Sequence, residues 1–472
     1  MLSSVPMADF ASETSDARLG SRRLPPALSG AIGHLLLRPW FDAVALPGIV
    51  RWYFPLSRAW AAAAVSGLDV DRFRAELPQV ELSARLAAVA LRALAPRQHA
   101  YLAEAAAWEH LFFGAHDPSP GQLVAAERSR ESAAHAFMAA RSAFLPLHLR
   151  RAFPPVKWMP SIEREVEKRH EVRLHDPSQA FPAPPIPEMT LSHRVPNLDG
   201  YVRWLRYKVE VAGTPDTAWA RVIEPETITA DTPTLIFLHG VGVETEFWKA
   251  DLGRVDSLAR SGVRVVRPEA PYHGRRRCDG WFGGEPVLAY GLLGMLDLFL
   301  AWVGEIARLV AWARATSRGP VAVGGISLGA LTSQLVAAVA GHWPAVMQPD
   351  ALMLVGTTGD VVDAAMTGGL GRALGVVERL ASQSWTAAAL RRWAPLLEPQ
   401  APPIMPPESI VMVIGTSDSV TPFDGGVALA QRWHLPAENL FLRRQGHFSV
   451  ALGLEHDTAP LDRVVAILRR KS

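Results

Sequence analysis

The chain has 472 residues, of which 49% are hydrophobic and 20% charged, so it can bury a sizeable core and is not disordered throughout. Its 48 Lys and Arg against 46 Asp and Glu leave a net charge of +2, which argues against a dedicated nucleic-acid-binding protein. The single cysteine, Cys278, excludes an internal disulfide framework and a multi-cysteine zinc site.

The first residues are polar, contain prolines and show no period, and we expect a flexible tail over 1–27. This stretch carries Asp9, Glu13 and Asp16 where a secretory signal would have its apolar core. The most apolar run of the chain, 287–313, is interrupted by charged residues and predicts a buried helix rather than a membrane span. We therefore expect a cytoplasmic protein.

A mainly helical region, ending in a proline-rich connector, is predicted over 28–190. Apolar residues recur at three- and four-residue steps between Leu82 and Leu94, and Pro96 predicts the end of that helix. Two further helices are predicted over 97–113 and 121–144.

The start of this helical region mixes aromatic and basic side chains, as an interfacial membrane segment would. Prolines at positions 39, 47 and 55 are expected to interrupt any long amphipathic helix there. Burial against the rest of the protein is therefore the preferred interpretation, and peripheral membrane contact is the alternative. The residues concerned are Arg38, Trp40, Phe41, Arg51, Trp52, Tyr53, Phe54, Arg58 and Trp60.

A sheet is predicted after the connector, which is clearest at 181–187. Residues 201–211 alternate between polar and apolar and pair with 217–223 as an antiparallel hairpin, with the turn at 213–216. Short continuous apolar runs separated by helical stretches follow, as expected for parallel strands covered on both faces. These runs are Leu235–Leu238, Val263–Val266, Val321–Val323, Leu352–Val355, Ile410–Ile414 and Leu440–Leu442. Residues 191–472 are therefore predicted to form an α/β domain.

The sharpest motif is Gly325-Ile326-Ser327-Leu328-Gly329, which lies between a predicted strand and a predicted helix. A serine on such a turn needs glycine neighbours, because a side chain at either position would collide with the adjoining strand and helix. The turn would push the Ser327 hydroxyl clear of the backbone and aim a helix N-terminus at developing negative charge. Ser327 is therefore the predicted nucleophile.

A serine nucleophile needs an imidazole base and a carboxylate that orients it. Asp418 and His447 each follow a predicted strand, so both should lie with Ser327 at the carboxyl edge of the sheet. His456 is the rival base, in a poorer strand context. Asp360, which follows an earlier strand, is the alternative acid.

Backbone N–H groups are the predicted donors to the oxyanion of the reaction. One is that of Leu328, directly after the nucleophile. The other belongs to Val241 or Gly242, in a loop after the strand that ends at Leu238.

Three further residues are candidates to line a substrate pocket. His239 is expected to brace the oxyanion loop rather than act as a base, and His273 lines the pocket or is a hydrogen-bonded loop residue. Arg275, in the run 275–277, is a candidate to bind a carboxylate or phosphate, but a solvated basic face is the preferred interpretation of that run.

Residues from about 199 to 470 resemble the α/β-hydrolase superfamily. The resemblance rests on the HG-x-G loop at 239–242, the G-x-S-x-G turn, the G-x-x-D turn that ends at Asp418 and the final G-H that ends at His447, in the chain order Ser, Asp, His. The segment 267–275, with the long helical region before it, resembles a little-characterised branch. The resemblance implies an α/β-hydrolase fold and a serine hydrolase.

We therefore predict an enzyme that cleaves a carboxylic ester, of a lipid or another acyl compound, through an acyl-enzyme. A helical cap around 361–397 is expected to shape the acyl pocket, with a plain packing helix as the alternative. No cofactor or metal is needed, and the spacing of His170 and His175 does not fit an H-E-x-x-H zinc helix. The alternatives are a catalytically silent binding or scaffold protein and, ranked lower, a peptidase.

Overall fold

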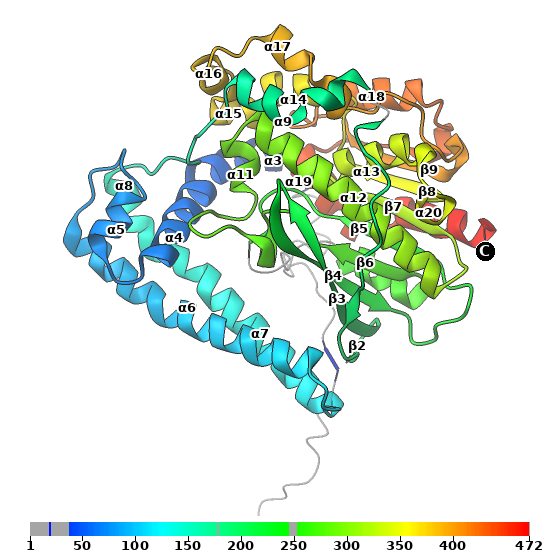
Figure 1. The fold of residues 1–472 in the computed structure, drawn as a ribbon, viewed down its shortest axis with the longest axis horizontal. Helices are drawn as coiled ribbons and strands as arrows, with labels where there is room; N and C mark the ends of the chain where they lie inside the picture. Colours follow the sequence, from blue (N-terminus) through cyan, green and yellow to red (C-terminus); the bar gives the residue numbers. More distant parts are fainter. Residues whose placement is uncertain (1–17, 20–36, 177–178, 245–252, 472) are drawn as a thin grey trace, which may run out of the picture.

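The computed structural model describes residues 18–19, 37–176, 179–244 and 253–471. A helical N-terminal region lies beside an α/β unit with a central sheet (Figure 1). The tail predicted over 1–27 lies outside the described residues, except that Leu19 forms a bridge with Asn197.

The described residues form a ten-stranded sheet in the order β1-β3-β4-β6-β5-β7-β8-β9-β10, with β2 paired to β3. The predicted hairpin is β3–β4, and its turn is shorter than expected, at Ala212–Gly213. From β5 to β10 neighbouring strands run parallel. The strands are β1 Thr190–Leu191, β2 Val195–Asn197, β3 Gly200–Val211, β4 Thr214–Glu224, β5 Thr234–Leu238, β6 Arg264–Pro268, β7 Val321–Ile326, β8 Ala351–Val355, β9 Ile410–Gly415 and β10 Leu440–Arg443.

Helices cover both faces of the sheet, which explains why the inner strands are continuous apolar runs. In β5, Ile236 and Leu238 pack in the core with α12 and α13, whereas Leu235 and Phe237 pack in a second core with α20. The helices of this unit outside the cap are α10 Gly253–Asp256, α11 Glu285–Ala289, α12 Leu292–Thr316, α13 Leu328–Val339, α18 Phe423–Arg432, α19 His447–Leu452 and α20 Ala459–Lys471.

The stretch predicted as a cap folds into short helices between β8 and β9. They are α14 Val361–Thr367, α15 Gly369–Leu374, α16 Val376–Ala381, α17 Ala387–Arg391 and the 3₁₀ turn η8 Ala394–Leu396. In Figure 1 they lie together at one end of the α/β unit.

The N-terminal region is built around a long antiparallel pair, α6 and α7, which stands out in Figure 1. The predicted end of a helix at Pro96 is wrong, because α6 runs through it. Pro96 has no N–H to donate to the Arg92 carbonyl four residues earlier, but Arg92 is exposed, so water can solvate that carbonyl. The elements are α3 Pro39–Gly48, the π-helix η1 Ile49–Tyr53, α4 Phe54–Ser66, α5 Val70–Ala75, α6 Ala84–Phe113, α7 Pro120–Ala139, the 3₁₀ turn η2 Ala140–Phe144, α8 Leu145–Arg150 and α9 Glu163–His175.

The expected interruption by prolines at the start of this region is also wrong. Helix α3 passes through η1 into α4 without a break: Pro39 lies in the first turn of α3, Pro47 lies inside α3, and Pro55 lies in the first turn of α4, directly after the π-turn η1. Of its aromatic side chains, Phe54 and Trp60 are buried, and Trp40 and Trp52 are exposed. Among the helices of the described ranges, none has both the length and the hydropathy to span a membrane.

Candidate active site

Ser327 occupies a sharp turn between β7 and α13. Its φ of 53° and ψ of −120° are rare for a residue with a side chain. A Cβ on Gly325 would lie 2.6 Å from the Gly329 backbone, and one on Gly329 would lie 2.6 Å from the Leu238 carbonyl oxygen. The two glycines therefore allow this turn to pack against β5, because a side chain at either position would collide with the neighbouring backbone.

Ser327, His447 and Asp418 come together at the carboxyl edge of the sheet. The Ser327 Oγ lies 2.9 Å from His447 Nε2, and His447 Nδ1 lies 2.8 Å from Asp418 Oδ2. Gly356, at the end of β8, faces this pair, because a Cβ there would lie 3.4 Å from the imidazole ring. The arrangement can pass a proton from a serine hydroxyl to an imidazole that a carboxylate orients.

Opposing effects act on the pKa of the His447 imidazole. Burial lowers the pKa of His447, but the charge of Asp418 and its hydrogen bond raise it, and the Asp42 carboxylate raises it further. The net pKa is above the ordinary 6.5.

Asp418 is held by its own loop. Its Oδ1 accepts the N–H groups of Val420 and Thr421, each at 2.9 Å, and its Oδ2 accepts the Thr421 hydroxyl at 2.8 Å. Thr421 was not among the residues predicted from the sequence. Its position three residues after the acid, in an Asx-type turn, is the pattern that could have identified it.

The two rival residues lie elsewhere. Asp360 caps α14, with its Oδ1 accepting the N–H of Asp363 at 2.7 Å. His456 lines a separate cavity together with Leu37 and Arg443.

The predicted oxyanion loop lies against the Ser327 turn. A Cβ on Gly240 would be 3.5 Å from the Ser327 Cβ. His239 braces this loop: its Nε2 accepts the Ala270 N–H at 3.0 Å, so its Nδ1 carries the proton and donates to the Gly240 carbonyl at 2.6 Å. The pKa of His239 lies well below 6.5, mainly because the side chain is buried and also because His273 is nearby.

Two mainly apolar cavities meet at Ser327, and Val241, Leu370 and Val420 line both. The first, which we call the cap cavity, has a volume of about 180 Å³ and is lined by α11, α12 and the cap helices, and by Leu328. The second, which we call the α3 cavity, has a volume of about 410 Å³. Its walls come from α3, η1 and α19, and His239 and His447 line it as well.

His273 and Arg275 line neither cavity. His273 is fully buried and packs on Gly284. Its Nδ1 donates to the Pro271 carbonyl at 2.8 Å, and burial lowers its pKa to about 4. Arg275 pairs with Glu269 and lies 4.0 Å from the Trp204 ring centre.

The preferred interpretation of 275–277 as a solvated basic face is wrong. Arg276 is buried in an ion pair with Glu305 at 2.7 Å, and Arg277 stacks on Trp60 at 4.7 Å. Acidic and aromatic partners distant in sequence bury all three guanidinium groups, partly or completely.

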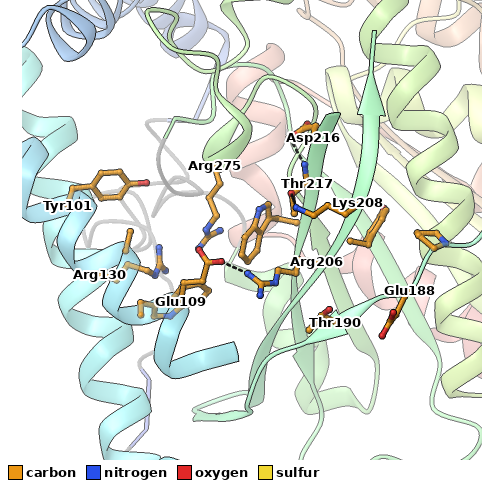
Figure 2. A pocket seen from close by; sticks show the side chains of 15 residues that line it. Tyr101, Glu109, Arg130, Glu188, Thr190, Arg206, Lys208, Asp216, Thr217 and Arg275 are labelled. Carbon is orange, nitrogen blue, oxygen red and sulfur yellow. Dashed lines mark hydrogen bonds and ion pairs between the residues drawn. The ribbon is translucent and has the colours of Figure 1, made fainter. Parts of the chain in front are cut away.

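A larger cleft, of about 860 Å³, lies apart from Ser327 between the α6–α7 pair and the β3–β4 hairpin (Figure 2). Its cationic side chains have partners: Arg206 pairs with Glu109, and Arg130 with Glu127 at 2.7 Å. In the described part of the chain, no group of three or more His, Cys, Asp or Glu could hold a metal ion.

One family model matches part of the sequence. The model of the family described as alpha/beta hydrolase domain containing 18 matches residues 212–358, which include the oxyanion loop and the Ser327 turn. No curated protein matches the sequence significantly.

Several solved esterases are similar in structure at low sequence identity. Acetyl xylan esterase 1 from Thermoanaerobacterium sp. JW/SL YS485 is 15% identical, with a TM-score of 0.41, covering 63% of this chain and 95% of that one. The acetyl xylan esterase from Paenibacillus sp. R4 is 14% identical, with a TM-score of 0.42, covering 66% and 97%. Brefeldin A esterase, a bacterial homologue of human hormone sensitive lipase, is 13% identical, with a TM-score of 0.39, covering 67% and 89%.

Proposed function

We propose, on the premise that the chain belongs to the α/β-hydrolase superfamily, that the protein is a serine hydrolase that cleaves carboxylic esters. The observation that carries the proposal is the continuous hydrogen-bonded series from the Ser327 hydroxyl through His447 to Asp418. A serine hydroxyl becomes a nucleophile at neutral pH when such a base can take its proton.

In the proposed reaction the Ser327 oxygen attacks the ester carbonyl carbon while His447 Nε2 takes the hydroxyl proton. The N–H groups of Leu328 and of Val241 or Gly242 stabilise the oxyanion that forms. When the intermediate collapses, the C–O bond to the alcohol breaks, and His447 returns the proton to the leaving oxygen. Water, deprotonated by His447, then attacks the acyl-enzyme carbonyl carbon. The C–O bond to Ser327 breaks, His447 returns the proton to the Ser327 oxygen, and the carboxylic acid leaves.

The apolar walls on both sides of Ser327 support an ester whose acyl and alcohol parts are both largely apolar, such as a lipid or another acyl ester. Each cavity would accept one of these two parts. Burial of each methylene would contribute about 0.8 kcal/mol to binding.

A fluorophosphonate probe tests the proposal, because it reacts covalently with an activated serine. We expect labelling of the wild type and none of Ser327→Ala. The matched control is Ser333→Ala in the same helix, whose hydroxyl donates to the Gly329 carbonyl at 2.8 Å and which should still be labelled. A panel of p-nitrophenyl esters of rising chain length should be hydrolysed with the same dependence on Ser327. Absence of labelling and of turnover on every ester would favour a binding or scaffold protein.

A further inference from the structure

Helix α3 of the N-terminal region contacts the segment that carries His447. The Asp42 carboxylate accepts the N–H of Phe448 at 2.5 Å, the N–H of Ser449 at 3.3 Å and the Ser449 hydroxyl. The Ser449 hydroxyl oxygen in turn accepts the Gly446 N–H at 2.8 Å. Asp42 therefore fixes the backbone on both sides of His447.

The fit at this contact is close. A Cβ on Gly446 would lie 2.4 Å from the Asp42 Cγ, so only glycine lets the carboxylate reach the loop. The Gln445 side chain donates to the Leu37 carbonyl at 3.1 Å, which adds a second link between the same two segments. Ser449 is fully buried, so water does not replace the hydrogen bond between its hydroxyl oxygen and the Gly446 N–H.

Further along the same continuous helix, η1 contacts the oxyanion loop. The Tyr53 hydroxyl donates to the Gly242 carbonyl at 3.2 Å. Arg141, from η2, lies 4.6 Å from the Tyr53 ring centre and 3.6 Å from the Glu244 carboxylate, whose side chain is fully buried. Fixing the Gly242 carbonyl orients the loop whose N–H groups are the proposed oxyanion donors.

We propose that Asp42 and Tyr53 are positioning residues of the active site, which hold the His447 loop and the oxyanion loop from a helix outside the α/β unit. This inference rests on the proposed serine hydrolase function. It makes the N-terminal region part of the catalytic machinery rather than an appended domain. Neither residue needs to touch the reacting atoms, because each acts through a loop that does.

The two contacts should differ in their effect on pH dependence. The carboxylates that act on the imidazole are Asp418, from the loop after β9, and Asp42, from α3. Tyr53 also lines the α3 cavity. Burial, and to a lesser extent the charge of Glu244, raises the pKa of Tyr53 far above neutrality, so its hydroxyl stays uncharged. Removing the Asp42 charge should therefore lower the pKa of His447, whereas removing the Tyr53 hydroxyl should not change it.

The experiment measures the rate constant of fluorophosphonate labelling against pH, which requires no knowledge of the natural substrate. For Asp42→Asn we expect a labelling rate lower by about tenfold, since misplacing a catalytic group by 1 Å can cost about a hundredfold. The midpoint of the acid limb should also move down by about half a pH unit, because a charge in direct contact shifts a pKa by about 1–3 units and this one is more distant. For Tyr53→Phe we expect a severalfold lower rate with the midpoint unchanged.

Matched controls are Asp71→Asn, which removes a 90% exposed carboxylate from α5, and Tyr101→Phe on α6; both should behave as wild type. Thermal melting establishes that each variant is folded. For Asp42→Asn, a lower rate with an unmoved midpoint would indicate general loosening and would overturn the inference. For Tyr53→Phe, the rate should fall although the melting temperature stays as in Tyr101→Phe, and a fall only in proportion to lost stability would overturn it. If Asp42→Asn does not fold, Ser449→Ala breaks the same link and should lower the rate. Wild-type rate and midpoint in Asp42→Asn, or a wild-type rate in Tyr53→Phe, would overturn the inference. A wild type that is not labelled would overturn the proposed function instead.

Discussion

At the scale of single residues, the acid limb of activity should report the ionisation of His447. The base must be neutral to accept the Ser327 proton, so activity should fall as the pH drops through its pKa. Burial lowers this pKa, but the charge and hydrogen bond of Asp418 outweigh burial and raise it above 6.5. We therefore expect a midpoint above pH 6.5 in the labelling rate.

Replacing the acid separates the two candidates for that role. Asp418→Asn should lower the labelling rate by about four orders of magnitude, as loss of the orienting carboxylate does in other triads, and should move any remaining acid limb to lower pH. Asp360→Asn is the control. It should retain the wild-type rate and nearly all of the stability, because the asparagine Oδ1 can still accept the Asp363 N–H and cap α14. The reverse order of effects would assign the acid to Asp360.

Gly356 is a second residue with a measurable role. Its φ of 58° suits glycine, and a Cβ would lie 3.4 Å from the His447 ring and 3.6 Å from Asp418 Oδ2. Gly356→Ala should cost about 1–2 kcal/mol in the free energy of unfolding, because a side chain disfavours this backbone conformation. It should also lower the labelling rate only slightly, because a Cβ 3.4 Å from the imidazole makes a van der Waals contact rather than a clash. Gly341→Ala, where a Cβ meets nothing within 4 Å, is the control and should do neither.

At the scale of elements, α6 offers a test of how a helix tolerates proline. Pro96 lies on the exposed side of α6, where water replaces only part of what the missing N–H would supply to the Arg92 carbonyl. Pro96→Ala should therefore stabilise the protein, by an amount below the roughly 3 kcal/mol typical of a helix interior. Chemical unfolding measures this, and a loss of stability would contradict the expected penalty for proline in the interior of α6.

The elements also show how far sequence reasoning reached. The strands β5, β7, β8 and β9 were predictable because burial on both faces leaves uninterrupted apolar runs, and the Ser327 turn because its glycines are sterically required. The prediction at Pro96 failed because proline usually ends a helix, whereas here the carbonyl that loses its partner, that of Arg92, lies on an exposed turn. The 275–277 run misled because the partners that bury it, such as Trp60 and Glu305, are far away in sequence.

The contribution of α3 to the site had no local signal at all. Asp42 is one acidic residue in an otherwise apolar helix, and its partners Phe448 and Ser449 are about four hundred residues away. Only the packing of α3 on α19 reveals the contact. Sequence patterns of this kind identify groups that carry chemistry better than groups that position them.

The cap helices should limit the length of the acyl chain that the enzyme accepts. Ala364 on α14 lines the cap cavity, and a phenyl group there would take up part of its volume of about 180 Å³. Each methylene kept out of the cavity costs about 0.8 kcal/mol, so Ala364→Phe should lower kcat/KM for long-chain p-nitrophenyl esters by about tenfold or more. Short esters should be little affected. Ala388→Phe, at an exposed position of α17, is the control, and an equal loss on all esters would contradict a role in binding the chain.

At the scale of the whole molecule, the N-terminal region and the α/β unit share one core. Phe54, Trp60 and Phe144 pack in the same cluster as Phe282 and Ala289 of the α/β unit. A buried ion pair crosses this boundary, since Arg58 on α4 lies 3.0 Å from Glu285 on α11 and both side chains are fully buried. The two parts should therefore unfold together in a single transition.

Arg58→Met tests this coupling, because it leaves a buried carboxylate without its counter-charge. Breaking a buried pair in this way costs about 3–5 kcal/mol, and the loss should appear as a lower free energy of unfolding of the whole chain. Burial already raises the pKa of Glu285 and Arg58 opposes that rise, so removing Arg58 should raise the pKa further. The deficit should then shrink as the pH falls through that raised value and the carboxyl takes up a proton.

The double variant Arg58→Met with Glu285→Gln separates charge from packing. It removes the unpaired charge while the amide oxygen can still accept the N–H of Lys157, which Glu285 accepts at 2.8 Å in the native protein. We expect it to recover most of the stability lost in the single variant, and to lose the pH dependence. If Arg58→Met instead unfolded in two steps, with the labelling of Ser327 retained after the first, the helical region would be a separable domain. The active-site loops could not then depend on α3 and η1 for their positions.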